Sequence, residues 1–264
     1  MGRLEELILG DSRRGIDRLM DLLPGDFCAQ TGRFVGAWPR GRVLLVTGFY
    51  VDGRGETDGP PGTKLLFDAL RKLGFSPLVV TDPFCAAYCT AAEMPFVTFG
   101  PEAGEEELRA LLDRERPVGL IAVERCGRAA DGRYVNAKGR DIRDTMAPLD
   151  ELFLGFDGPT VGIGDGGNEI GMGNLADAVA RRLGRVPCAV RAGRLVVATV
   201  SNWGALGLCG ALGRLPTETD LLAAYRLCTE AGLIDGITGE SALSEDGFPL
   251  AYVLKLRNDL EARI

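Results

Sequence analysis

Residues 160–174 read T-V-G-I-G-D-G-G-N-E-I-G-M-G-N, and glycine occupies six of these fifteen positions. The apolar start predicts a buried strand over 160–164, and the remainder leads into a helix near 174–184. Glycine at this density lets the backbone approach a ligand closely and adopt positive φ. The loop also holds two carboxylates and two carboxamides, namely Asp165, Glu169, Asn168 and Asn174. Because these polar groups alternate with glycines, a ligand site is favoured over a merely tight strand-to-helix corner.

The same glycines satisfy the G-x-G-x-x-G pattern of dinucleotide-binding loops. Asp165 stands inside the pattern, where its charge would repel a pyrophosphate. A ribose-binding acid is expected near residue 185, but that region carries arginines instead, and no Walker-type lysine follows the glycines. We therefore predict no nucleotide cofactor at this loop.

The rest of the chain alternates apolar strand patterns with helical ones. Strands are predicted over 42–47, 77–81, 96–99, 117–123, 160–164 and 194–200. Helices are predicted over 63–73, 85–93, 102–114, 144–154, 174–184, 204–213 and 217–231, with a last one from Pro249. This alternation is typical of βαβ units. We predict an α/β fold with a mainly parallel sheet flanked by helices, in one compact domain over residues 1–264.

The N-terminal segment, residues 1–24, has the apolar spacing of an amphipathic helix or a pair of helices. Pro24 and Gly25 are expected to end it. Arg13, Arg14 and Asp17 lie on its polar side, and we interpret them mainly as solvated surface charges.

The formal net charge of −7 argues against a nucleic-acid partner or an anionic membrane surface, which usually need a basic face. The sequence contains no apolar run of membrane-spanning length, and its first residues lack a signal-peptide pattern. A cytoplasmic location is therefore expected. The expected partner is a small-molecule substrate, and the sequence is compatible with a homo-oligomer.

Histidine is absent from the 264 residues. Catalytic triads and dyads that use histidine are thereby excluded, as are histidine-ligated zinc and a histidine base. Acid–base chemistry must use carboxylates, lysine, tyrosine, cysteine or metal-bound water. A metal site would be built from oxygen ligands, which suit Mg²⁺, Mn²⁺ or Ca²⁺. The seven cysteines contain no C-x-x-C pair and are expected to be reduced and mostly buried.

An acidic or amide side chain follows nearly every predicted strand. In parallel sheets, ligands bind beyond the carboxyl ends of the strands. The residues in these places are Glu56, Asp58, Asp82, Glu124, Asp165, Glu169, Ser201 and Asn202. One of them alone would be read as a helix cap. Together they predict an acidic pocket that can hold a hard cation or take a proton from an ammonium group, because crowded carboxylates raise one another's pKa.

Four segments together resemble the D-glutamate cyclase family. They are G-I-G-D-G-G-N-E-I-G-M-G at 162–173, T-G-F-Y at 47–50 with E-T-D-G-P-P-G at 56–62, E-R at 124–125 with Y-V-N-A-K-G-R-D-I at 134–142, and V-S-N-W-G at 200–204. They occur in the family's order and span nearly the whole chain. E-R-C-G stands where E-R-P-G is expected, and Y-V-N-A-K-G departs from the expected Y-Y-N-M-R-G; neither change removes an acid of the pocket.

The resemblance implies a lyase that converts D-glutamate to 5-oxo-D-proline and water by intramolecular lactam formation. Lactam closure needs a neutral α-amine, so a carboxylate must take its proton. The γ-carboxylate must also become electrophilic and lose an oxygen, which a hard metal ion or a protonated carboxyl can assist. The acidic pocket suits both needs.

On this basis we assign roles as hypotheses. The catalytic centre comprises Asp165, Glu169, Glu56 and Asp58, as general base or metal ligands. Substrate carboxylates are bound by Asn168, Asn202, Gly166, Gly167, Arg125 and Ser201. The candidate ligands of a Mg²⁺, Mn²⁺ or Ca²⁺ ion are Asp58, Asp82, Glu124, Asp165 and Glu169. Two alternatives stay open: another metal-dependent enzyme of the phosphohydrolase type, and a non-catalytic protein that binds a small molecule or cation.

Overall fold

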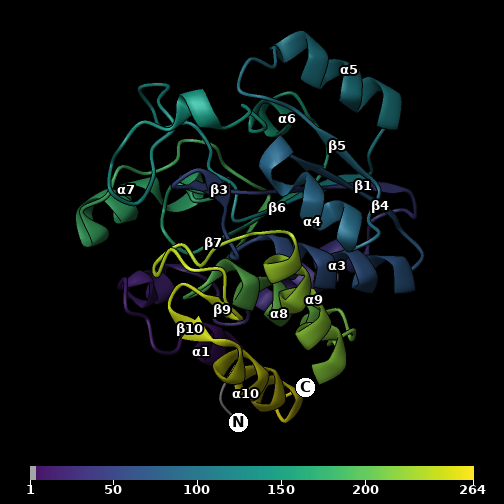
Figure 1. Cartoon of the computed structure of the whole chain (residues 1–264), viewed down its shortest axis with the longest axis vertical. Helices are drawn as coiled ribbons and strands as arrows, with labels where there is room; N and C mark the ends of the chain where they lie inside the picture. The colour runs from purple at the N-terminus through teal and green to yellow at the C-terminus, as the bar shows by residue number, and fades with distance from the viewer. Residues whose placement is uncertain (1–3) are drawn as a thin grey trace.

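Six parallel strands form the centre of the computed structural model, which describes residues 4–264 (Figure 1). The strands are β1 (Arg42–Thr47), β4 (Ser76–Thr81), β5 (Phe96–Thr98), β6 (Gly119–Val123), β7 (Thr160–Gly164) and β8 (Arg194–Val197). β6 and β7 are buried along their whole length, and β1 is buried from its second residue on. Burial on both faces explains why their sequences are continuous apolar runs without alternation. The predicted α/β fold with a parallel sheet is confirmed.

The strands lie side by side in the order β5-β4-β1-β6-β7-β8. Numbered along the chain within this sheet, that order is 3-2-1-4-5-6, the doubly wound arrangement. The direction of winding reverses between β1 and β6, which pair in parallel up to Thr47 opposite Val123. Doubly wound sheets bind ligands in the crevice at this reversal, beyond the carboxyl ends of the strands.

Helices cover both faces of the sheet (Figure 1). One face carries α5 (Glu105–Glu115) and α6 (Glu151–Leu154), which contact each other. The other face carries the larger layer, with α2 (Phe27–Gly36), α3 (Pro60–Lys72), α8 (Ser201–Ala211), α9 (Glu218–Glu230) and α10 (Leu250–Glu261). The short α1 (Leu4–Ile8) packs beside α10 and α8, and α4 (Ala86–Ala91) packs against α9.

Helix α8 is the central helix of the larger layer. It contacts β6, β7 and β8 on one side and α1, α2, α3 and α10 on the others. Ten of its residues, Ser201 to Gly210, are buried. A helix surrounded in this way needs no polar face, and α8 accordingly has none.

Short elements complete the described chain. Two antiparallel hairpins are formed by β2 (Tyr50–Val51) with β3 (Arg54–Gly55), and by β9 (Ser244–Glu245) with β10 (Phe248–Pro249). The short helical segments are η1 (Ile16–Leu22), η2 (Pro83–Cys85), η3 (Arg143–Thr145), η4 (Gly173–Leu175), α7 (Ala176–Ala178) and the π-helical η5 (Val179–Leu183).

The N-terminal segment contains a pair of helices, α1 and η1, which is one of the two predicted arrangements. Several other predictions were wrong, and α2 was not predicted at all. α3 begins at Pro60, three residues before its predicted start, because proline fits the first helical turn, where its missing N–H is not needed. β8 ends at Val197, and α8 begins at Ser201 where a strand end and loop were predicted. Ser201 and Asn202 are therefore the first residues of a helix.

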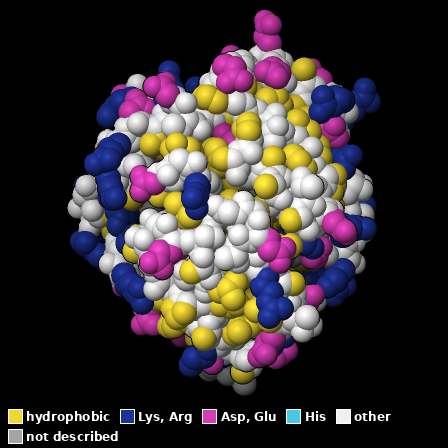
Figure 2. Space-filling view, in the orientation of Figure 1, with side chains coloured by type: hydrophobic (Ala, Val, Ile, Leu, Met, Phe, Trp, Pro, Cys, Tyr) yellow, Lys and Arg dark blue, Asp and Glu magenta, His cyan; other side chains and the backbone are white. Residues whose placement is uncertain are grey.

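All seven cysteines are buried and free of disulfides, as predicted. Among residues 4–264, no helix combines the length and apolar composition that crossing a membrane would require. Basic and acidic side chains are interspersed on the face in Figure 2, with apolar side chains between them.

Candidate active site

Six buried carboxylates converge beyond the carboxyl ends of β1, β6 and β7. Two come from the segment between β3 and α3, one follows β6, two lie in the glycine loop after β7, and one lies in the turn between β9 and β10. They are Glu56, Asp58, Glu124, Asp165, Glu169 and Asp246. We call this group the acidic centre. Sequence reasoning predicted five of the six.

Asp165 belongs to two compact sets of carboxylates. In one set its oxygen lies within 4.8 Å of oxygens of Asp58 and Asp246, and in the other within 4.8 Å of oxygens of Glu124 and Glu169. Among residues 4–264 these are the sets close enough to share one ion. Oxygen donors at this spacing fit a hard divalent cation.

Asp58 is fixed at the N-terminus of α8. Its Oδ2 accepts the Ser201 N–H at 2.9 Å, and its Oδ1 accepts the Asn202 N–H at 2.8 Å. The first N–H groups of a helix have no partner inside the helix, and they favour a negative charge. The start of α8 therefore orients the Asp58 carboxylate.

Ser201 and Asn202 also use their side chains inside the protein. The Ser201 hydroxyl donates to Glu124. The Asn202 carboxamide oxygen accepts the Gly59 and Gly62 N–H groups at 3.0 and 2.8 Å, and its nitrogen donates to the Thr57 carbonyl at 2.9 Å. That nitrogen also donates to a buried carboxylate of β9, Glu245. Asn202, predicted to bind substrate, thus holds the loop that carries Glu56 and Asp58.

The glycine loop wraps around Glu169. The Gly166 and Gly167 N–H groups, predicted to bind substrate, donate to the two carboxylate oxygens of Glu169 at 2.8 and 2.7 Å. Gly167 has φ of 109°, a conformation that side chains oppose. A methyl group on Gly162 would lie 2.3 Å from the Ile170 carbonyl oxygen, so the returning loop needs glycine there as well. The Asn168 side chain donates to the Val135 carbonyl at 3.0 Å.

Arg14 is the cation of the acidic centre, although its sequence position suggested a surface charge. Its Nη2 donates to both Asp165 and Asp246. The Arg14 carbonyl in turn accepts a bond of 2.9 Å from Arg185, whose other nitrogen donates to the Gly166 carbonyl at 2.8 Å. The interpretation of Arg14 as solvated surface was wrong, because the segment before η1 folds across the end of β7.

Asp82 and Arg125 form a separate, fully buried ion pair. Arg125 also donates to the carbonyls of Gly48, at 2.9 Å, and Ala147, and Asp82 accepts the Ala147 N–H at 2.6 Å. The structure therefore does not bring Asp82 into either carboxylate set, and it gives Arg125 an internal acid as its partner. Both residues hold the loops after β1 and β6 in place.

Burial is the main cause of raised pKa values in the acidic centre. It raises the pKa of Asp58 to about 7, with the charge of Asp246 adding to the effect. It also raises the pKa of Glu56, Glu124 and Asp165 well above the usual range, and neighbouring carboxylates contribute. Arg14 opposes the shift at Asp165. Several carboxyls here can therefore hold a proton near neutral pH, and such a site can both give and accept protons.

Two residues of the acidic centre have a positive backbone φ angle. Glu124 has φ of 46° and Asp246 has φ of 47°. Non-glycine residues rarely adopt the left-handed region, and such residues cluster at ligand sites.

Sequence reasoning missed three residues here, namely Arg14, Glu245 and Asp246. Glu245 and Asp246 belong to the hairpin β9–β10, which is outside the parallel sheet, so the rule of strand ends could not find them. Burial raises the pKa of Glu245 to about 8, with the charge of Asp58 adding to the effect. The one available signal was the turn sequence S-E-D-G at 244–247.

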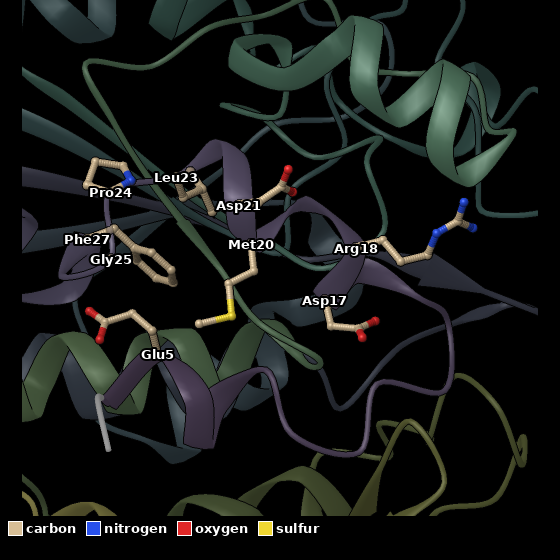
Figure 3. A pocket seen from close by; sticks show the side chains of 9 residues that line it. All are labelled: Glu5, Asp17, Arg18, Met20, Asp21, Leu23, Pro24, Gly25 and Phe27. Carbon is tan, nitrogen blue, oxygen red and sulfur yellow. The ribbon is translucent and has the colours of Figure 1, made fainter. Parts of the chain in front are cut away.

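One cavity borders the acidic centre at Asp246, and a second lies at the glycine loop. The first, of about 140 Å³, is lined by Arg13, Arg14, Thr199, Ile237, Asp246 and Phe248. The second, of about 190 Å³, includes Gly166 and Asn168 in its wall. A larger cavity of about 500 Å³, around Met20 and Phe27, is lined by no residue of the acidic centre (Figure 3).

The family profile described as "D-glutamate cyclase-like, C-terminal" matches residues 4–261. The chain belongs to the D-glutamate cyclase-like family. A human protein named "D-glutamate cyclase, mitochondrial" is 34% identical over 198 residues. The match covers 64% of this chain and 32% of the human protein, so this family member spans about a third of the length of that relative. The relative's name places it in mitochondria, and a cytoplasmic location for this D-glutamate cyclase-like chain stays a prediction.

Proposed function

We propose that this domain cyclises D-glutamate to 5-oxo-D-proline with release of water. The observation that carries the proposal is the pair of buried carboxylate sets that share Asp165. The name of the human relative, which matches over 64% of the chain, supports the same reaction. The family relation supports an enzyme of the cyclase type rather than a passive binding protein.

The reaction moves two protons from nitrogen to oxygen. The substrate's ammonium group must lose one proton before its nitrogen attacks the γ-carbon, and a second after the C–N bond forms. The γ-carboxylate must gain two protons as its C–O bond breaks and water leaves. The reaction therefore needs proton acceptors and donors together, with no net change in the protein.

The raised pKa values suit this exchange. A carboxylate whose pKa lies near 7, as for Asp58, is a stronger base than an ordinary aspartate and a usable acid at neutral pH. We assign Asp165, together with Asp58 and Asp246 of one of its two sets, to the ammonium side. We assign Glu124 and Glu169 to the γ-carboxyl, where the protonated carboxyl of Glu124 would stabilise the departing oxygen. Burial of the site keeps competing water away.

A hard divalent cation fits the same residues. Glu124, Asp165 and Glu169 would hold Mg²⁺ or Mn²⁺, because all their donors are oxygens within reach of one ion. Such an ion, when bound, would polarise a carboxyl oxygen as a Lewis acid. The remaining acids would still handle the protons.

The test is a chirally resolved assay of 5-oxoproline formed from D-glutamate and, in parallel, from L-glutamate. Faster formation from the D-enantiomer supports the proposal. Phosphate release from simple esters that depends on Mg²⁺ would indicate the phosphohydrolase alternative. Binding of D-glutamate without any product would indicate a sensor. Either of these two results, with no 5-oxoproline, would overturn the proposal.

A further inference from the structure

The wall of the cavity of about 140 Å³ beside the acidic centre carries positive and negative side chains. Arg13 and Arg14 supply the positive charges, and Asp246 supplies the negative charge. A free α-amino acid carries the same pair of charges, one ammonium and one carboxylate, on a single carbon. The cavity therefore offers complementary partners for that end of the substrate.

Arg14 has donors left for a ligand. Its bonds to Asp165, Asp246 and the Thr199 carbonyl all use Nη2. Within residues 4–264, Nε and Nη1 of Arg14 have no hydrogen-bond partner, and 27% of the side chain is exposed. The planar guanidinium can bind a carboxylate through these two nitrogens at once.

The position of Arg14 is fixed rather than free. Arg185 holds its carbonyl at 2.9 Å, and Thr199 binds the same segment through the Gly10 carbonyl at 2.8 Å. Nη2 is anchored by the two aspartates. An anchored guanidinium loses little conformational entropy when it binds a ligand.

We propose that Arg14 binds the α-carboxylate of the amino-acid substrate while Asp246 binds its ammonium. This inference rests on the proposed function. The γ-carboxyl is the less suitable partner for Arg14, because it must be protonated to react and a guanidinium holds carboxylates in their charged form. The α-carboxylate stays charged throughout. The substrate's side chain then extends toward Glu124 and Glu169.

The decisive variant is Arg14→Lys. Its ammonium can still neutralise Asp165 and Asp246, so a merely structural role predicts an unchanged KM. A role in binding predicts that KM for D-glutamate rises about 10- to 100-fold, the value of a hydrogen-bonded charge pair, with little change in kcat. Arg18→Lys is the matched control, because Arg18 lies on the same N-terminal segment and is exposed. It should leave both constants unchanged.

A substrate analogue sharpens the test. 4-Aminobutyrate is glutamate without the α-carboxylate, so its inhibition constant should be similar for the wild type and Arg14→Lys. The inference would be overturned if Arg14→Lys raised KM for D-glutamate and the inhibition constant of 4-aminobutyrate by the same factor. An unchanged KM for D-glutamate would also overturn it. If the wild type binds D-glutamate by calorimetry without turnover, loss of that binding in Arg14→Lys would support the inference while the proposed function fails. No binding to the wild type would overturn both.

Discussion

Arg125 and Arg14 both donate to buried aspartates, but the numbers of acids around them differ. Arg125 faces Asp82 alone and also donates to the carbonyls of Gly48 and Ala147, while its buried Nε has no partner among residues 4–264. Arg14 faces Asp165 and Asp246, with Asp58 and Glu124 close enough to act on its charge. The first site is neutral and closed. The second has more acids than cations, so it has affinity left for a proton, an ammonium group or a metal ion.

The largest effect should come from a change in the acidic centre. Asp165→Asn keeps the shape of the side chain but removes a base shared by both carboxylate sets, and we expect kcat to fall about 10²- to 10⁴-fold. The thermal transition should remain cooperative, because the variant removes a buried charge and also the free energy that burying this charge costs. Initial rates of 5-oxoproline formation and a thermal melt check this. Retained turnover would contradict the assignment of Asp165.

Arg125→Met should show the opposite pattern. It leaves the Asp82 charge buried without its partner, which should lower the free energy of unfolding by about 3–5 kcal/mol. The folded fraction should keep a near-normal KM, since Arg125 has no place in the acidic centre. Urea unfolding measures the loss, and the double variant Asp82→Asn with Arg125→Met should recover part of it. A large rise in KM without loss of stability would instead revive the prediction that Arg125 binds substrate.

A divalent cation should stabilise the acidic centre and leave the Arg125 site unaffected. At one hundred times its dissociation constant, Mn²⁺ would add about 2.7 kcal/mol to the free energy of unfolding. The gain should be larger at pH 8 than at pH 5, because protons compete for the same oxygens, and Asp165→Asn should reduce it. Melts with Mn²⁺ and with EDTA test this. Indifference to both would favour proton transfer by carboxylates alone.

Stability should fall as pH rises through the neutral range. Glu245 has a pKa raised from 4.5 to about 8, so its protonated form favours the folded state. Its contribution is full below pH 4.5 and is lost as pH approaches 8. Each such group changes the free energy of unfolding by at most about 1.4 kcal/mol per pH unit. Glu245→Gln should flatten the slope between pH 5 and pH 8 in urea titrations, and an unchanged slope would contradict the shift.

The sequence was sufficient to predict the sheet and most of the acids. Buried parallel strands are written as continuous apolar runs, and the fold brings their carboxyl ends to one edge, so Glu124, Asp165 and Glu169 could be placed together. The direction of each side chain could not be predicted. Asp82 also follows a strand, but Arg125 and the Ala147 N–H hold it away from the other acids.

Arg14 and Asp246 escaped prediction for a different reason. Arg14 is 151 residues from Asp165 and 232 residues from Asp246 along the chain. Arg14 and Asp246 also both lie on irregular segments. Irregular segments carry no periodicity that would show which way they face. Likewise, the roles of Gly166, Gly167 and Asn202 depend on hydrogen-bond partners that only the folded chain identifies.

The Gly166 and Gly167 amides form an anion-binding nest whose anion, the Glu169 carboxylate, belongs to the same loop. In dinucleotide-binding sheets a glycine loop of this kind receives a phosphate from solution. Here a phosphate would have to displace the Glu169 carboxylate, which is tethered to the loop and therefore has a high effective concentration. The negative charge of that carboxylate would also repel the phosphate. We therefore expect the loop to reject phosphates, because Glu169 already occupies the two amides, and we expect Glu169→Ala to leave these amides open to a small anion.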